Sequence, residues 1–214
     1  MEFKELNQKG YELRENEGKH AEALNVFKQA LEVAEDFDQR SEAMSQLGLT
    51  HWHMKDFDAA RKVWSENLTL CEKAGQPGPL ALAYRNMGRP EITSDWEKQL
   101  EFMKNSFELA EKAGREDAVW FAHGVVAAAI KAEKLDVAKE WSEIEFVELQ
   151  KHLEGTIEVP NQNNVHIWHT GYLMGVALIR EDITKLEEAM VIAKKASLPK
   201  RIEQIKELMD GFEN

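Results

Sequence analysis

Three segments of the chain end in nearly the same residues, and this repetition constrains the fold more than any other feature. The copies are Leu68–Gly75, Phe107–Gly114 and Met190–Ser197, and Leu31–Ala34 matches their first half. The equivalent small residues Ala34, Cys71, Ala110 and Ala193 lie 37, 39 and 83 residues apart. Because 83 is about twice the other spacings, a degenerate copy is expected near residues 147–153. A period of this length predicts a stack of similar units, each too small to bury its own apolar face.

The apolar residues between these copies recur at the period of an α-helix. In residues 20–37 they are Ala21, Leu24, Phe27, Leu31, Ala34 and Phe37, at steps of three or four. Residues 57–74 and 96–113 repeat the pattern. With five prolines and no run of alternating β-branched residues, the sequence offers almost no strand candidates. The pattern predicts an all-α protein.

A second marker precedes each of these copies by about one helix. It consists of Gly10, Gly48, Gly88, Gly124 and Gly175, which are spaced 38, 40, 36 and 51 residues apart. Glycine inside a helix costs roughly 1 kcal/mol relative to alanine. Its recurrence at one position of the repeat therefore predicts that the two helices of a hairpin approach closely there.

A small residue on a first helix, followed by an aromatic residue between small residues on a second helix, resembles the tetratricopeptide repeat. The matching residues are Gly10, Ala23, Phe27 and Ala30 in the first unit, Leu47, Gly48, Ala60 and Trp64 in the second, and Gly124, Ala138 and Trp141 in the fourth. The resemblance implies a right-handed superhelix, or solenoid, of about five helical hairpins plus a C-terminal capping helix. It also implies that the first helix of each hairpin lines a concave groove. The two-carboxylate clamp of some chaperone-binding members is not reproduced, because Tyr11 stands where that clamp would need asparagine.

The expected hairpin units cover residues 3–37, 40–74, 79–113, 117–152 and 164–196, and the cap covers 199–212. The loop Glu154–Asn164 accounts for the 51-residue spacing. No change in composition marks a boundary, so a single domain over residues 1–214 is predicted.

The charge of the chain is unevenly distributed. It holds 27 basic and 39 acidic residues, a net charge of −12, which argues against nucleic-acid or anionic-membrane partners. The predicted first helices nevertheless carry a net +5, which leaves −17 for the remainder. A single cysteine, Cys71, and the lack of a secretory leader or a long apolar run predict a cytoplasmic protein that neither contains disulfides nor spans a membrane.

The register of the glycines predicts which side chains face the groove. The set is Asn7, Tyr11, Arg14, Ser45, Leu49, Trp52, His53, Arg85, Arg89, Phe121, His169, Tyr172 and Arg180. Arginine forks onto carboxylates and aromatic rings cover apolar side chains. We therefore expect a protein scaffold or adaptor that binds a partner protein or peptide, with an acidic or C-terminal segment as the favoured ligand.

The sequence gives little sign of catalysis or of a cofactor. It has no phosphate-binding loop, no nucleophile elbow and no plausible Cys–His pair. No metal site is predicted, although His166 and His169, three apart on one helix, are close enough to share an ion. Two alternatives stay open. One is an enzyme that binds a small molecule or metal where Trp52, His53, His123, His166 and His169 converge. The other is a structural subunit that self-assembles through its acidic back; no oligomeric state is predicted.

Overall fold

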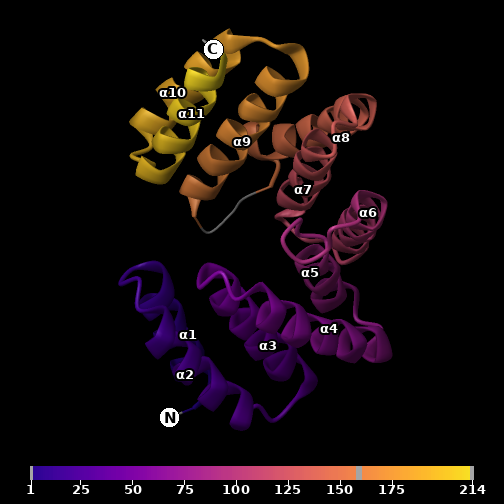
Figure 1. The fold of residues 1–214 in the computed structure, drawn as a ribbon, viewed down its shortest axis with the longest axis vertical. Helices are drawn as coiled ribbons and strands as arrows, with labels where there is room; N and C mark the ends of the chain where they lie inside the picture. Colours follow the sequence, from indigo (N-terminus) through magenta and orange to yellow (C-terminus); the bar gives the residue numbers. More distant parts are fainter. Residues whose placement is uncertain (1, 158–160, 213–214) are drawn as a thin grey trace. The chain divides into compact units, whose positions relative to one another are not determined.

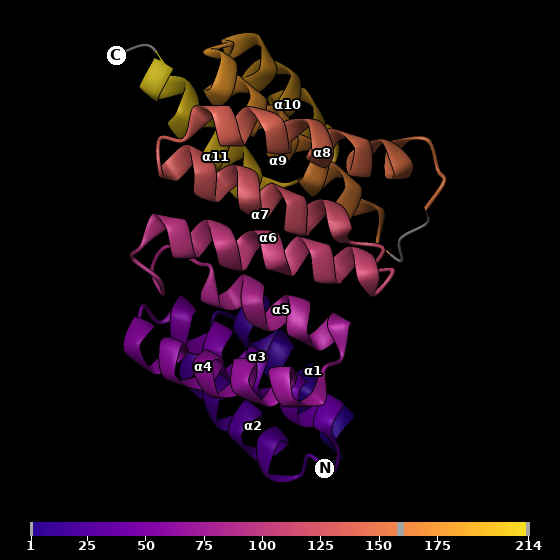
Figure 2. The same ribbon diagram turned by 90° about the vertical axis from the view of Figure 1, so that its right-hand side faces the viewer.

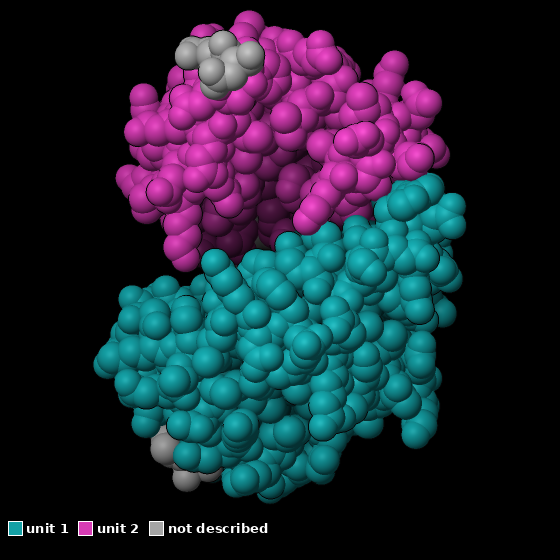
Figure 3. Space-filling view, viewed as in Figure 1, with its two compact units in different colours: residues 1–113 teal, residues 114–214 magenta. Residues whose placement is uncertain are grey.

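The computed structural model describes residues 2–157 and 161–212, which divide into two compact units (Figures 1 and 3). Unit 1 is Met1–Ala113 and unit 2 is Gly114–Asn214. The described residues form eleven α-helices and no strand. The predicted all-α fold is confirmed, and a single domain over 1–214 stays a prediction. Among the helices of the described residues, none combines the length and apolar character that a membrane span requires.

Unit 1 is a stack of three helical hairpins. The hairpins pair α1 (Phe3–Glu15) with α2 (His20–Glu32), α3 (Phe37–His53) with α4 (Phe57–Ala74), and α5 (Pro77–Met87) with α6 (Trp96–Lys112). Each hairpin also packs on the next, and the first helices touch one another, α1 against α3 and α3 against α5. The first helices of unit 1 therefore form one layer.

Unit 2 contains two hairpins and a final helix. The hairpins pair α7 (Ala118–Lys131) with α8 (Leu135–Leu153) and α9 (Gln162–Arg180) with α10 (Ile183–Lys195). Figure 2 shows α7 and α8 side by side along most of their length. Helix α11 (Pro199–Phe212) packs on α10 and α9, as expected of a capping helix. The layer of first helices in this unit is α7, α9 and α11.

The largest difference from the predicted helix boundaries lies between the first two hairpins. The expected helix over 20–37 ends at Glu32, and Phe37 opens the next helix instead of closing the stripe of α2. Asp36 explains the change, because its side chain accepts a hydrogen bond from the backbone N–H of Gln39 and so caps α3. Of the expected loop Glu154–Asn164, residues 158–160 lie outside the described residues, and its end is already helical.

Helix ends elsewhere follow the signals in the sequence. Gly75 adopts a left-handed conformation with φ of 66° as the C-cap of α4, and its N–H donates to the carbonyl of Cys71. Gly114 and Ser197, the equivalent residues of the two other copies, have φ of 63° and 55°. The repeated segment therefore ends in the same backbone turn three times, once without glycine.

Close contact within the hairpins explains three of the recurring glycines. A Cβ atom on Gly10 would lie 2.6 Å from the ring of Phe27, and one on Gly48 would overlap the indole of Trp64. One on Gly88 would lie 3.0 Å from Met103. Phe27 and Trp64 are fully buried, so their rings have no space to retreat into.

We expect Gly48→Ala to lower the free energy of unfolding by about 2–3 kcal/mol, because the new methyl group would collide with a buried indole. Gly211→Ala is the matched control, since nothing lies within 4 Å of a Cβ there. It should change stability by less than about 1 kcal/mol. Urea unfolding followed by circular dichroism measures both. Equal midpoints for Gly48→Ala and the wild type would contradict the packing explanation.

Candidate functional site

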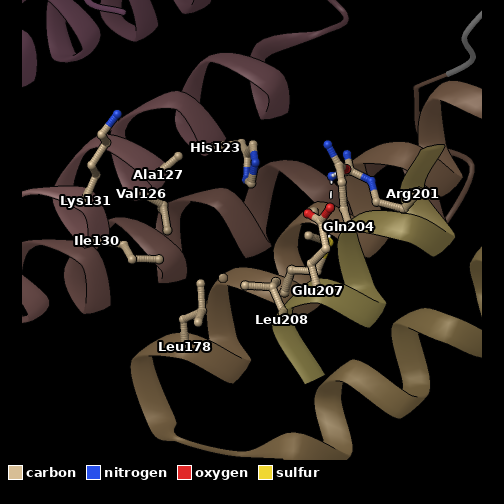
Figure 4. Close-up of a pocket in the computed structure, with 13 residues that line it drawn as sticks. His123, Val126, Ala127, Ile130, Lys131, Leu178, Arg201, Gln204, Glu207 and Leu208 are labelled. Atoms are coloured by element: carbon tan, nitrogen blue, oxygen red, sulfur yellow. Dashed lines mark hydrogen bonds between the residues drawn. The ribbon is translucent and has the colours of Figure 1, made fainter. Parts of the chain in front are cut away.

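A pocket in unit 2 lies between α7, α9 and α11, the layer formed by its first helices (Figure 4). Its volume is about 420 Å³. The apolar part of the lining comes from all three helices and consists of Val126, Ala127, Ile130, Met174, Leu178 and Leu208. The pocket therefore offers an apolar floor on the face where the repeat resemblance places ligand contacts.

The space between α7 and α9 depends on two glycines of α9. A Cβ atom on Gly171 would lie 3.2 Å from the ring of His123, and one on Gly175 would lie 3.4 Å from Val126. Both neighbours are on α7 and both line the pocket. Gly175 thus faces the preceding hairpin and not its own partner α10, so the glycine register does not extend to the last unit.

Polar side chains also line this pocket. They are His123 and Lys131 on α7 and Arg201, Gln204 and Glu207 on α11. Figure 4 shows Gln204 beside Arg201, with His123 facing them from α7. A rim of this kind around an apolar floor fixes the orientation of a ligand, while the floor removes apolar surface from water.

His123 is held in place by a buried carboxylate on α8. Its Nδ1 lies 2.9 Å from Oε1 of Glu145, a residue that is only 1% exposed. The other carboxylate oxygen of Glu145 is buried and has no hydrogen-bond partner among the described residues. The contact holds the ring against α9, where a Cβ atom on Gly171 would lie 3.2 Å from Cε1, 3.4 Å from Nε2 and 3.6 Å from Nδ1.

The residues of unit 2 that the glycine register predicts do not line this pocket. Tyr172 stacks on Phe146 of α8 with ring centroids 5.3 Å apart. The guanidinium of Arg180 lies 3.7 Å from the carboxylate of Glu143, which is also on α8. Phe121 is fully buried, with the guanidinium of Arg115 5.2 Å from its ring centroid. Burial explains why Phe121 is a core residue and not a surface contact.

Counting from the recurring glycines did not find the pocket, for two reasons. Gly175 does not occupy the equivalent position in the last hairpin, and the capping helix α11 carries none of the five recurring glycines. The pocket's lining residues on α11, Arg201, Gln204 and Leu208, recur at steps of three and four, so they share one helical face. That spacing is the signal through which the sequence could have indicated this wall.

In unit 1 the structure does bring several predicted residues together. The guanidinium of Arg89 lies 4.7 Å from the ring centroid of Trp52 and 5.5 Å from that of Trp64. The indole N–H of Trp52 donates to Glu91 over 3.2 Å. Burial lowers the pKa of Arg89 to about 10, although Glu91 opposes the shift. At that value Arg89 remains charged near neutral pH, and the rings on which it lies stabilise the charge.

His53 lies next to this cluster and stacks on His20, with ring centroids 5.5 Å apart. Its Nε2 is 3.8 Å from a carboxylate oxygen of Glu15. Burial lowers the pKa of His53, with a smaller opposing effect from Glu15. His53 is therefore favoured in its neutral form more strongly than a histidine in water.

Arg14, predicted to face a ligand, is used inside unit 1. It is 3% exposed, and its guanidinium donates to Glu15 over 2.7 Å and to the backbone carbonyl of Gln46 over 3.2 Å. Asn7 donates to Glu42 of α3 over 2.5 Å. Both side chains connect α1 to α3 through these hydrogen bonds. Fewer of their donor groups therefore remain for a partner protein.

The other predicted residues of unit 1 differ in exposure. Tyr11 is 48% exposed, whereas Arg85 is buried at 8%. Ser45 accepts hydrogen bonds from Trp64 and Asn67, and Leu49 packs into the apolar cluster around Trp64. Of these four residues, Tyr11 offers the most surface to a partner.

His166 and His169 lie on α9, where the sequence places them on one helix. The residues that the structure describes contain no group of three or more His, Cys, Asp or Glu side chains that could hold a metal ion. Burial lowers the pKa of His169, and the neighbouring His166 adds to the effect.

Comparison with known proteins agrees with the architecture. A sequence profile described as the tetratricopeptide repeat matches residues 6–37. The crystal structure of BtubC (BKLC) from P. vanneervenii is similar with a TM-score of 0.63 and 15% identity, over 94% of this chain and 78% of that one. A structure described as a kinesin light chain of Podosopora anserina with nearly identical repeats gives a TM-score of 0.62 and 10% identity, over 95% and 94%. No curated protein sequence matches the chain.

The matched repeat and the paired helices of both units define the fold class: the chain has a tetratricopeptide-like helical-repeat fold. Proteins of this class serve in general as scaffolds for interactions with other proteins, without catalytic activity of their own. At 15% and 10% identity, the likeness to the two solved structures is a likeness of fold.

The lowered pKa of His53 leads to a pH prediction. An unfolded histidine takes up a proton near pH 6.5, whereas folded His53 does so only at lower pH, so the unfolded state binds more protons in that interval. The contribution of His53 to stability should therefore be complete above about pH 6.5 and decline below it. Urea midpoints between about pH 7.5 and 5.5 should fall less in His53→Gln than in the wild type. A His53 pKa at or above 6.5 in an NMR titration would contradict this.

Proposed function

We propose that this chain is a protein-interaction scaffold whose unit 2 holds an apolar side chain of a partner segment. The observation that carries the proposal is the pocket between α7, α9 and α11. Its volume of about 420 Å³ falls in the range of roughly 300–1,000 Å³ that is usual for ligand sites. Partner segments commonly bind through one or two such anchors, surrounded by contacts of lower energy.

The rim of the pocket supports a ligand that continues beyond it. Ala127, Lys131, Gln204 and Glu207 are exposed lining residues, so the chain on either side of an anchor can leave the pocket along the surface. Val126 and Gly175 are buried below them and define the floor. This arrangement suits a segment of polypeptide better than a fully enclosed small molecule.

Contacts in unit 1 are a further part of the proposal. Tyr11 of α1 is exposed, and Trp52, His53 and Arg89 form a half-buried cluster in the same unit. The positive charge of Arg89 favours an acidic segment at this surface. A cytoplasmic location is proposed with it, as the compartment that suits a chain with one buried, unpaired cysteine.

The enzyme alternative draws on residues of both units. Trp52 and His53 belong to unit 1, whereas His123, His166 and His169 belong to unit 2. Within unit 2, His123 lines the pocket but His166 and His169 do not. The pocket therefore favours the scaffold over the histidine-rich active site.

Filling the pocket should weaken the binding of partner segments. Ala127 is exposed and lines the pocket, so Ala127→Trp would occupy the space without disturbing the core. In a displayed peptide library, peptides enriched on the wild type should share an apolar position and bind Ala127→Trp at least about tenfold more weakly.

Ala74→Trp is the matched control, because Ala74 is an exposed helical alanine in unit 1. It should retain the binding of the wild type. Library peptides that bind Ala127→Trp and the wild type equally, or a library without any enrichment on the wild type, would contradict the proposal.

A further inference from the structure

Arg201 places a positive charge at the pocket and has only uncharged hydrogen-bond partners among the residues that the structure describes. Its guanidinium donates to the backbone carbonyl of Ile167 over 3.2 Å, to the amide oxygen of Gln204 over 2.9 Å and to the sulfur of Met174 over 3.7 Å. All three acceptors are uncharged. Among the described residues, no carboxylate lies within ion-pair distance of Arg201.

Burial makes this charge costly. The pKa of Arg201 is lowered from its ordinary value, and removal from water is the cause, with no neighbouring acid opposing it. A partly desolvated cation without a counter-ion is stabilised by any anion that enters its site. The neutral acceptors fix the direction of the guanidinium while leaving its charge uncompensated.

The apolar floor lies next to this charge. Met174, which accepts from Arg201, is itself a lining residue on α9, and Leu208 lies two turns beyond Arg201 on the same face of α11. Figure 4 shows Ile130 and Leu178 at the far end of the pocket from Arg201. One end thus suits an anion and the other an apolar group.

We propose that the pocket binds the C-terminal residue of a partner polypeptide, with its carboxylate on Arg201 and its apolar side chain on the floor. This inference rests on the proposed function and names the chemistry of the anchor. A C-terminal residue carries both groups on one carbon, which matches the neighbouring anionic and apolar ends of the pocket.

Glu207 makes the pocket better suited to a single carboxylate than to a segment with several acidic side chains. It lies exposed on the rim of the same pocket and repels a second negative charge near the first. A single carboxylate that reaches Arg201 avoids this repulsion, and the backbone N–H of a C-terminal residue can donate to Glu207. A partner segment with several acidic side chains gains less here than one that ends in an apolar residue.

Methyl NMR provides the test, because Ile130, Met174, Leu178 and Leu208 carry methyl groups in the pocket. The probes are N-acetyl-glycyl-leucine with a free carboxylate, the same compound as its C-terminal amide, and hexanoate. We expect the free acid to shift these methyl signals and to bind at least about tenfold more tightly than the amide. Hexanoate, which lacks the peptide group, should bind more weakly than the free acid.

Arg201→Gln should remove the preference for the acid over the amide. Arg180→Gln is the matched control and should keep it, because Arg180 is an exposed arginine of unit 2 outside the pocket. The acid–amide comparison on the wild type decides the question even if Arg201→Gln fails to fold.

Each outcome has one meaning. Equal binding of the acid and the amide would overturn the carboxylate assignment and leave the apolar anchor intact. Tighter binding of hexanoate would overturn the assignment to a polypeptide end. If neither peptide shifts the pocket methyl groups, the proposed function of this pocket fails together with the inference.

Discussion

The contact between a first-helix glycine and a second-helix ring is the constraint on which the hairpins of unit 1 depend. Gly10 against Phe27 and Gly48 against Trp64 bring the two backbones of a hairpin close together, and both rings are fully buried. The indole N–H of Trp64 also donates to the backbone carbonyl of Ser45 over 3.2 Å, so the ring joins the two helices by packing and by a hydrogen bond. Hairpins fixed in this way can stack, because each presents a defined surface to the next.

Much of the fold could be predicted from the sequence, because its signals are local. Helical periodicity and the Gly75 turn identify the hairpins, and the resemblance of units one and two adds their pairing. The sequence pattern does not show the helix boundary near Phe37, because Phe37 lies at the helical spacing that would extend the apolar face of the preceding helix. Only the capping bond from Asp36 shows that a new helix has begun.

The candidate site was harder to predict, because it depends on contacts between hairpins. Gly175 lies at the expected spacing but touches Val126 of α7, so offsets counted from it select side chains that turn away from the pocket. Tyr172 accordingly packs on Phe146. A residue such as Arg14 also carries no mark in the sequence to show that Glu15 and the carbonyl of Gln46 already bind it. Arginines on first helices therefore need not be available for ligands.

Helix α11 serves two purposes at once, since it closes the apolar end of unit 2 and supplies a wall of the pocket. Ile205 is its one buried residue among Pro199–Phe212, and the partly buried Ile202, Leu208, Met209 and Phe212 pack on the same cluster. Leu208 also lines the pocket. Occupancy of the pocket and attachment of this helix are consequently linked equilibria. A ligand bound at Arg201 as proposed would slow the exchange of the backbone amides of α11 with solvent, and fraying of α11 would release the ligand.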